Sequence, residues 1–351
     1  MTSSDDQLDL HMHYSLSTQH SIPHGWLRSR FGYARNSHTH AQGFFHPWRL
    51  PQRHGGHVLS WLMTRQPAQW PVWEDNPPLK DLPTLRPSAE LNDWKVWFIG
   101  HVTCLIQIGK CNFLTDPVWA MRASPVDFAG PRRVRPAGLA LEQLPKIDAV
   151  LLSHNHYDHM DLAALNWLHR RDQMPIYTGL ANAQYLPKSM HVIEMDWWDQ
   201  LPLPQEPSIQ IVFTPAQHFS GRGLRDGNQA LWGGLSILTP EDHLFFAGDT
   251  GYSAHFGEIK QRLGAPRLAL LPIGAYEPRA IMRAMHMNPA DAVQAHLDLA
   301  AQRSLAIHYR TFQLTDEAMN QPLLDLATAL TQQQLASDCF YTPIEGEVVE
   351  V

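Results

Sequence analysis

Cysteine is scarce in this chain. Its 351 residues include three, Cys104, Cys111 and Cys339. An odd and sparse set does not provide a disulfide framework and favours a reducing compartment. None of the three has the spacing of a thiolate metal site, so we expect small, apolar, buried side chains.

Long apolar runs and an excess of basic residues are also missing. No stretch of about 18 apolar residues is present to span a bilayer, and the first residues lack the pattern of a signal peptide. The formal net charge of −7 at pH 7 argues against nucleic acid as a partner, because affinity for phosphate backbones comes from clustered lysine and arginine. These absences predict a soluble, cytoplasmic protein.

The N-terminal part is rich in tryptophan, histidine and proline but shows no sustained periodicity. We therefore predict an irregular arm over residues 1–93, with one helix near 58–65 and disorder in the first dozen residues. The histidines of the arm are irregularly spaced, and we do not expect them to bind metal.

From residue 94 onward, short apolar runs alternate with helical patterns. The runs predict buried strands over 95–99, 103–108, 112–114, 149–153, 209–213, 235–238, 244–247, 268–273 and 305–307. Helices are expected over 161–171, 254–263, 289–301 and 316–334, and Asn288 followed by Pro289 is typical of a helix start. This mixture predicts one layered α/β domain over residues 94–351.

One segment concentrates potential metal ligands at the end of a buried strand. His154, His156, Asp158 and His159 follow the strand over 149–153. Side chains two residues apart in extended backbone point the same way, so His154 and His156 can hold one ion together. Asp158 and His159 are adjacent and face differently, which suits a second ion. A polar surface loop is the alternative, but it does not explain four ligand-type side chains in this place.

Further candidate ligands stand at the ends of later strands: His218, Asp249 and His308. Strand ends at one edge of a sheet converge in space. The seven oxygen and nitrogen ligands suit two zinc ions, with iron or manganese as alternatives and Asp249 as a bridging carboxylate. A water molecule shared by two such ions can have a pKa of about 7. It can act as a nucleophile at neutral pH, which favours hydrolysis over redox chemistry.

This ligand pattern resembles the signature of the metallo-β-lactamase superfamily, which implies an α/β fold of the αββα four-layer sandwich type. More narrowly, the chain resembles the N-acylphosphatidylethanolamine-hydrolysing phospholipase D family over roughly residues 94–312. The matching stretches are 98–101, 114–117, 122–125, 130–131, 147–161, 196–198, 213–215, 245–252, 272–279 and 306–308.

The resemblance implies a zinc-dependent phosphodiester hydrolase that cleaves N-acylphosphatidylethanolamine-like phospholipids to phosphatidic acid and N-acylethanolamine, by attack of a metal-bridging hydroxide. It gives catalytic roles to Asp158, Asp249 and His286. His286 precedes a helix start, where it can contact phosphate oxygens or protonate the leaving group. Asp116 is expected either to orient a ligand histidine or only to form a turn with Pro117.

Weaker candidates surround this set. Tyr276, Glu277 and Arg279 follow a strand and either bind substrate or form a structural loop. Three arginines either attract an anionic head group or form a solvated cluster: Arg132, Arg133 and Arg135. The aromatic side chains of the arm lie at a membrane interface, cover an acyl-chain groove, pack on the domain or mediate a homodimer: Trp26, Phe31, Phe44, Phe45, Trp48 and Trp61.

Two other functions stay open beside the phospholipase. The first is a different hydrolase on the same fold, either a lactonase acting on phosphorylated sugar lactones or a phosphodiesterase acting on cyclic nucleotides or RNA, although the net negative charge argues against RNA. The second is a non-catalytic interaction protein, which the presence of all seven ligands argues against. Peripheral attachment to a membrane and a homodimer also stay open, because the arm offers a surface for either.

Overall fold

The computed structural model describes residues 39–40, 43–46, 60–61, 63–77, 88 and 90–351. The predicted helix near 58–65 is present at residues 60, 61, 63 and 64. The predicted disorder of the first dozen residues lies outside the described part, and so do Trp26, Phe31 and Trp48.

Within the described part, two seven-stranded sheets form the centre of the fold. The first has the order β16 (Val348–Glu350), β3 (Trp94–Gly100), β4 (Thr103–Ile108), β5 (Cys111–Thr115), β6 (Ala149–Leu152), β7 (Ile176–Gly179), β8 (Val192–Met195). The second has the order β15 (Phe340–Tyr341), β14 (Arg303–Ile307), β13 (Leu268–Pro272), β12 (His243–Phe246), β11 (Gly234–Leu238), β10 (Glu206–Thr214), β9 (Gln200–Leu203). A separate two-stranded sheet pairs β1 (Thr39–His40) with β2 (Gly43–Phe44).

Both sheets combine antiparallel and parallel strands. In the first sheet β3, β4 and β5 are antiparallel, whereas β5 to β8 are parallel. In the second, β9 to β12 are antiparallel and β12 to β15 are parallel. Parallel strands need crossover connections. The loops that leave the carboxyl ends of β5, β6, β12, β13 and β14 are therefore the natural places for a site.

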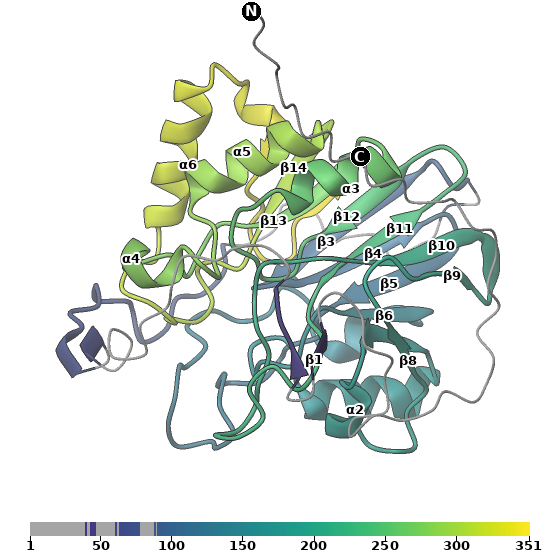
Figure 1. Cartoon of the computed structure of the whole chain (residues 1–351), viewed down its shortest axis with the longest axis horizontal. Coiled ribbons are helices and arrows are strands. Elements are labelled where there is room, and N and C mark those ends of the chain that lie inside the picture. Colours follow the sequence, from purple (N-terminus) through teal and green to yellow (C-terminus); the bar gives the residue numbers. More distant parts are fainter. Residues whose placement is uncertain (1–38, 41–42, 47–59, 62, 78–87, 89) are drawn as a thin grey trace, which may run out of the picture. The chain divides into compact units, whose positions relative to one another are not determined.

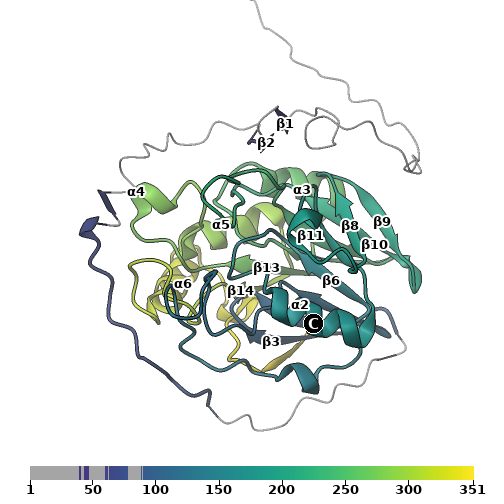
Figure 2. The same ribbon diagram turned by 90° about the horizontal axis from the view of Figure 1, so that it is seen from below.

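Helices cover the outer faces of the two sheets. Leu165 and Leu168 of α2 (Leu162–Asp172) share one buried cluster with Val150 and Ile176 of the first sheet. The helices α3 (His255–Leu263), α5 (Pro289–Leu299) and α6 (Gln321–Gln332) lie on the side of the second sheet (Figures 1 and 2). The order helix, sheet, sheet, helix confirms the predicted αββα four-layer sandwich.

All strands predicted from apolar runs are present, and their bounds differ by a few residues at most. The sequence missed the short strands β1, β2, β7, β8, β9, β15 and β16, because runs of two to four residues carry little periodic signal. It also missed the single turn of α4 (Arg279–Met282). Among the described helices, none is long and apolar enough to cross a membrane.

The helix predicted over 316–334 begins later, at Gln321. Asp316 is held instead by Trp61 and Arg65 of the arm, whose side-chain nitrogens donate to its carboxylate at 2.5 and 2.9 Å. The carboxylate of Glu317 accepts the backbone N–H of Ala275 at 2.6 Å. These tertiary contacts hold residues 316–317 in a loop, so helical propensity decides only the part that follows.

The described part of the arm packs on the domain. Besides Trp61, Trp70 donates its indole N–H to the carbonyl of Glu317 at 2.9 Å, and Phe44 is buried. Glu74 forms an ion pair with the buried Arg135. Of the four roles left open for the aromatic side chains of the arm, packing on the domain is the one observed for Phe44 and Trp61.

Candidate metal centre

Four predicted ligands lie in the loop between β6 and α2. The loop is fixed at its far end by Asp161, whose carboxylate caps α2 by accepting the N–H groups of Ala163 and Ala164. The same carboxylate accepts the N–H groups of Trp119 and Ala120 at 3.0 and 2.9 Å. Because Asp161 ties the loop both to α2 and to the segment after β5, the ligands preceding it are held in place.

The first cluster consists of three histidines. His154 Nε2 lies 2.8 Å from His156 Nδ1, and His218 Nε2 lies 3.2 Å from the same atom. His218 comes from the segment after β10, in the other sheet. Tetrahedral nitrogen ligands about 2.0–2.1 Å from an ion would lie roughly 3.3 Å apart. The three nitrogens therefore fit one ion, as the sequence predicts for His154 and His156.

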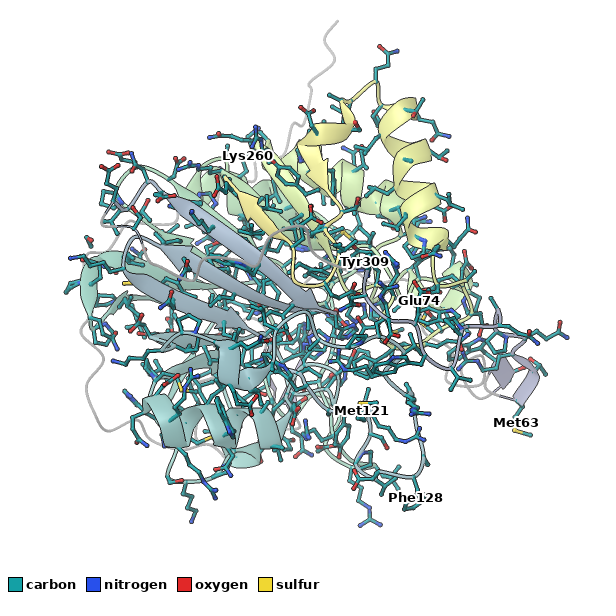
Figure 3. All side chains as sticks on the ribbon, turned by 180° about the vertical axis from the view of Figure 1, so that it is seen from behind. Met63, Glu74, Met121, Phe128, Lys260 and Tyr309 are labelled. Carbon is teal, nitrogen blue, oxygen red and sulfur yellow. The ribbon has the colours of Figure 1, made fainter. Side chains whose placement is uncertain are left out.

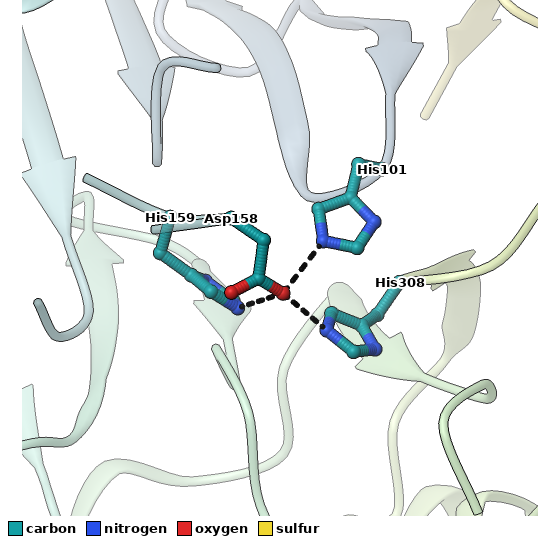
Figure 4. Close-up of side chains that lie close together, drawn as sticks. All are labelled: His101, Asp158, His159 and His308. Carbon is teal, nitrogen blue, oxygen red and sulfur yellow. Dashed lines mark hydrogen bonds and ion pairs between the residues drawn. The ribbon is translucent and has the colours of Figure 1, made fainter. Parts of the chain in front are cut away.

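The second cluster surrounds one carboxylate oxygen (Figure 4). Asp158 Oδ2 lies 3.1 Å from His101 Nε2, 3.5 Å from His159 Nε2 and 3.3 Å from His308 Nε2. Asp158 and His159 come from the loop after β6, and His308 comes from the end of β14. Asp158, His159 and His308 form the second group of predicted ligands. His101 was not among them.

Asp249 lies between the two clusters. Its Oδ2 is 3.2 Å from Nε2 of both His159 and His308, and 3.7 Å from Nε2 of His218. One oxygen atom therefore faces ligands of both clusters, which is the position of the bridging carboxylate predicted from the sequence. All seven predicted ligands are brought together.

The donor atoms fit metal ions. Among the described residues, His159 Nε2 and Asp249 Oδ1 are buried without a hydrogen-bond partner, although buried polar atoms are almost always satisfied. Burial lowers the pKa of His156 to about 4 and holds the pKa of His154 well below its usual value. Both imidazoles are therefore neutral and can offer a lone pair.

In the second cluster the ligand histidines hold their protons more strongly than a free imidazole does. Burial lowers the pKa of His308, but the carboxylates of Asp249 and Asp158 outweigh it and raise that pKa to about 9. The same opposition raises the pKa of His159 well above its usual value. A cation that binds here must displace protons, so its binding depends on pH.

A carboxylate outside the ligand set orients His159. Asp116 Oδ2 accepts Nδ1–H of His159 at 2.6 Å, which leaves Nε2 to face the site. The N–H and hydroxyl of Ser153 also donate to Asp116, at 2.7 and 2.6 Å. Asp116 has the predicted orienting role. Gly248, at φ 59°, allows this packing, because a Cβ there would lie 2.6 Å from Cβ of Ser153.

Two histidines outside the predicted ligand set, His101 and His46, contact ligand residues. His101 lies at the turn between β3 and β4; its Nδ1 has no hydrogen-bond partner among the described residues. Because the Asp158 carboxylate accepts hydrogen bonds, His101 Nε2 is the protonated nitrogen. His46 of the arm donates from Nε2 to the carbonyl of His218 at 2.5 Å and packs on Trp232. The one sequence signal was that residues 98–101 match the family.

His286, predicted to act on the phosphate, lies at the rim of the ligand set. Its Nδ1 is 3.8 Å from Asp249 Oδ2, and its ring centroid is 5.1 Å from that of His218. Arg279 Nη1 donates to the carbonyl of His286 at 2.8 Å and also forms an ion pair with Asp291 of α5. Burial lowers the pKa of His286 to about 3. The imidazole is therefore neutral and can donate one N–H.

The other predicted substrate contacts have structural partners. The Tyr276 hydroxyl donates to Asp325 of α6 at 2.5 Å, and Glu277 accepts the backbone N–H of Arg279 at 3.0 Å. Arg279 reaches the backbone of His286 rather than a ligand. Direct contacts of these three residues with substrate stay a prediction.

The prediction of a solvent-exposed arginine cluster is wrong for two of the three arginines. Arg133 and Arg135 are buried. Arg133 Nη2 donates to the carbonyl of Val118 at 2.8 Å, and Arg135 Nε lies 3.1 Å from the carboxylate of Glu345. Arg132 is exposed. A run of arginines shows its charge in the sequence but not its distant partner.

Residues 111–309 match the profile of the beta-lactamase superfamily domain. The chain is 36% identical over 265 residues to N-acyl-phosphatidylethanolamine-hydrolyzing phospholipase D 1 of Caenorhabditis elegans, covering 72% of this chain and 74% of that protein. It is 36% identical over 301 residues to the mitochondrial N-acyl-phosphatidylethanolamine-hydrolyzing phospholipase D of Saccharomyces cerevisiae, covering 76% of this chain and 62% of the yeast protein.

The fold also has solved counterparts. A metallo hydrolase from Ignicoccus hospitalis superposes with a TM-score of 0.55 at 23% identity, covering 74% of this chain and 98% of that chain. At this identity the likeness concerns the fold alone. With the profile match and the two curated relatives, the chain belongs to the metal-dependent hydrolases of the beta-lactamase superfamily and, within them, to the N-acylphosphatidylethanolamine-hydrolysing phospholipase D family.

Proposed function

We propose that this protein is a dizinc phosphodiesterase of the phospholipase D type, which cleaves N-acylphosphatidylethanolamine-like phospholipids into phosphatidic acid and an N-acylethanolamine. The observation that carries the proposal is the pair of ligand clusters facing Asp249 Oδ2 from two sides. Relatives named for this activity, at 36% identity, support the choice of substrate.

The chain's own residues divide into two groups. His154, His156 and His218 would hold one ion, and Asp158, His159 and His308 the other, with Asp249 shared. When bound, two divalent ions supply a nucleophilic hydroxide at neutral pH and neutralise charge on the phosphate. Asp116 keeps Nε2 of His159 free for its ion by holding the proton on Nδ1.

His286 is the residue placed to contact the phosphate beside the ions. Its ring lies close to ligands of both clusters, with centroids 5.1 Å from His218 and 5.5 Å from His308. The neutral imidazole would donate an N–H to a phosphate oxygen. Arg279 holds the backbone of His286 and α5 begins just after it, so its position is fixed before substrate arrives.

The test compares three substrates with zinc-loaded protein: an N-acylphosphatidylethanolamine, bis(p-nitrophenyl) phosphate and a lactone. We expect hydrolysis of the lipid, weak activity in His286→Ala and none in Asp158→Asn. His296→Ala is the matched control, because His296 is buried on α5 and contacts Ser304 rather than a ligand. Hydrolysis of the lactone alone would be consistent with the metal centre but would contradict the proposed phospholipase activity.

A further inference from the structure

Large apolar side chains are exposed in and next to a hollow that adjoins the loop between β6 and α2. The hollow has a volume of about 880 Å³, and its lining includes Met121, Arg122, Tyr157, Leu162 and Arg222. Tyr157 directly precedes the ligand Asp158, so the hollow adjoins the ligand-bearing loop. An exposed apolar patch at the rim of a hollow commonly marks a surface that binds something.

Two loops contribute residues to the lining of this hollow, Asp127 from the first and Arg222 from the second. Phe128 lies at the outer end of the first, beyond Met121, and is 83% exposed (Figure 3). Leu224 belongs to the second loop, two residues after Arg222, and is fully exposed. We call Met121, Phe128, Leu162 and Leu224 the docking face. All four are exposed to solvent, although burying apolar side chains of this size away from water is energetically favourable.

The second loop is tied to the ligand-bearing loop. Arg222 Nη1 donates to the carbonyls of Asn155 and Met160, each at 2.9 Å. Its guanidinium lies 3.9 Å from the centre of the Tyr157 ring, and the Tyr157 hydroxyl donates to the Arg222 carbonyl. A molecule that binds Leu224 would therefore be held at a fixed position beside the metal ligands.

Charge identifies the occupant. Residues 119–132 and 220–227 contain four arginines and two aspartates, in a chain of net charge −7. Arg132 and Arg225 are exposed, whereas Arg122 and Arg222 are half-buried. Apolar side chains at loop tips, beside exposed arginines, fit a bilayer with anionic lipids, because the tips enter the acyl region while the arginines stay at the head groups.

We propose that the docking face is a membrane-binding surface that places the ligand clusters over anionic phospholipid. The inference rests on the proposed phospholipid substrate, and it assigns membrane contact to loops of the domain rather than to the described aromatic side chains of the arm. Trp61 and Trp70 already donate their indole N–H groups to residues 316 and 317.

The experiment measures flotation of the full-length, zinc-loaded protein with vesicles of phosphatidylcholine, with and without phosphatidylglycerol. We expect binding to the anionic vesicles. Phe128→Ser combined with Leu224→Ser should weaken it about 100-fold, since each of the two buried apolar side chains contributes a factor of about ten. Arg132→Gln and Arg225→Gln should each weaken it about fivefold at low salt. Leu324→Ser is the matched control, because Leu324 on α6 is 62% exposed.

Unchanged vesicle binding in the Phe128/Leu224 variant, or an equal loss in the Leu324 control, would overturn the proposal. A change of oligomeric state in the Phe128/Leu224 variant, measured by analytical ultracentrifugation, would also overturn it by showing that a second copy covers the face. Hydrolysis of soluble bis(p-nitrophenyl) phosphate is measured in parallel. Activity without vesicle binding refutes the docking face alone, whereas vesicle binding without lipid hydrolysis refutes the proposed function alone.

Discussion

Replacing Asp116 by asparagine should weaken metal binding although Asp116 is not a ligand. Asp116 is fully buried and accepts three hydrogen bonds, from His159 Nδ1 at 2.6 Å and from the hydroxyl and N–H of Ser153 at 2.6 and 2.7 Å. Asparagine has a single acceptor oxygen, and its NH₂ group would face one of these donors. His159 would then lose the bond that keeps its proton on Nδ1.

Loss of such an outer partner typically costs about 10–100-fold in metal affinity, which is about 1.4–2.8 kcal/mol. We expect a loss in this range when zinc is withdrawn from purified protein by competition with a chromogenic chelator. Asp148→Asn is the matched control, because Asp148 accepts the backbone N–H of Asn112 and touches no ligand. Equal zinc affinity in Asp116→Asn and wild type would refute the orienting role.

Three further outcomes follow from the same contacts. His101→Ala should lose zinc from the second cluster, whereas His101→Gln should retain more of it, because glutamine can still donate a hydrogen bond to Asp158. Equal zinc content in the two variants would contradict the hydrogen-bonding role of His101. Zinc affinity should fall as the pH is lowered from about 9, because a proton then competes with zinc for His308, whose pKa is raised to about 9. Chelator titrations over a series of pH values below 9 measure this dependence. Asp316→Ala should lower the free energy of unfolding by about 1–2 kcal/mol, measured by urea unfolding, because Trp61 loses its hydrogen-bond acceptor. The arm should also become more sensitive to limited proteolysis, and unchanged cleavage would contradict its attachment through Asp316.

The metal ligands could be predicted because their signal is local. His154, His156, Asp158 and His159 follow one apolar run, and the remaining ligands each follow another. Strand ends at one edge meet in space whatever the detailed packing. Short apolar runs that alternate with helical patterns predicted the layered α/β domain, and the resemblance to the metallo-β-lactamase superfamily implied its four layers.

The positions of the residues that the sequence did not predict depend on contacts between distant parts of the chain. His101 meets Asp158 because the turn between β3 and β4 lies beside the loop after β6. Arg135 is buried because Glu345, near the end of the chain, neutralises it. His46 reaches the carbonyl of His218 from the arm. Neither composition nor periodicity encodes such pairs.

The most direct test of the two-ion centre is a crystal structure of the zinc-loaded protein with anomalous data at the zinc edge. We predict two peaks on opposite sides of the Asp249 carboxylate, one among His154, His156 and His218 and the other among Asp158, His159 and His308. A single peak, or peaks away from Asp249, would contradict a shared carboxylate and with it the hydrolytic centre proposed for this chain.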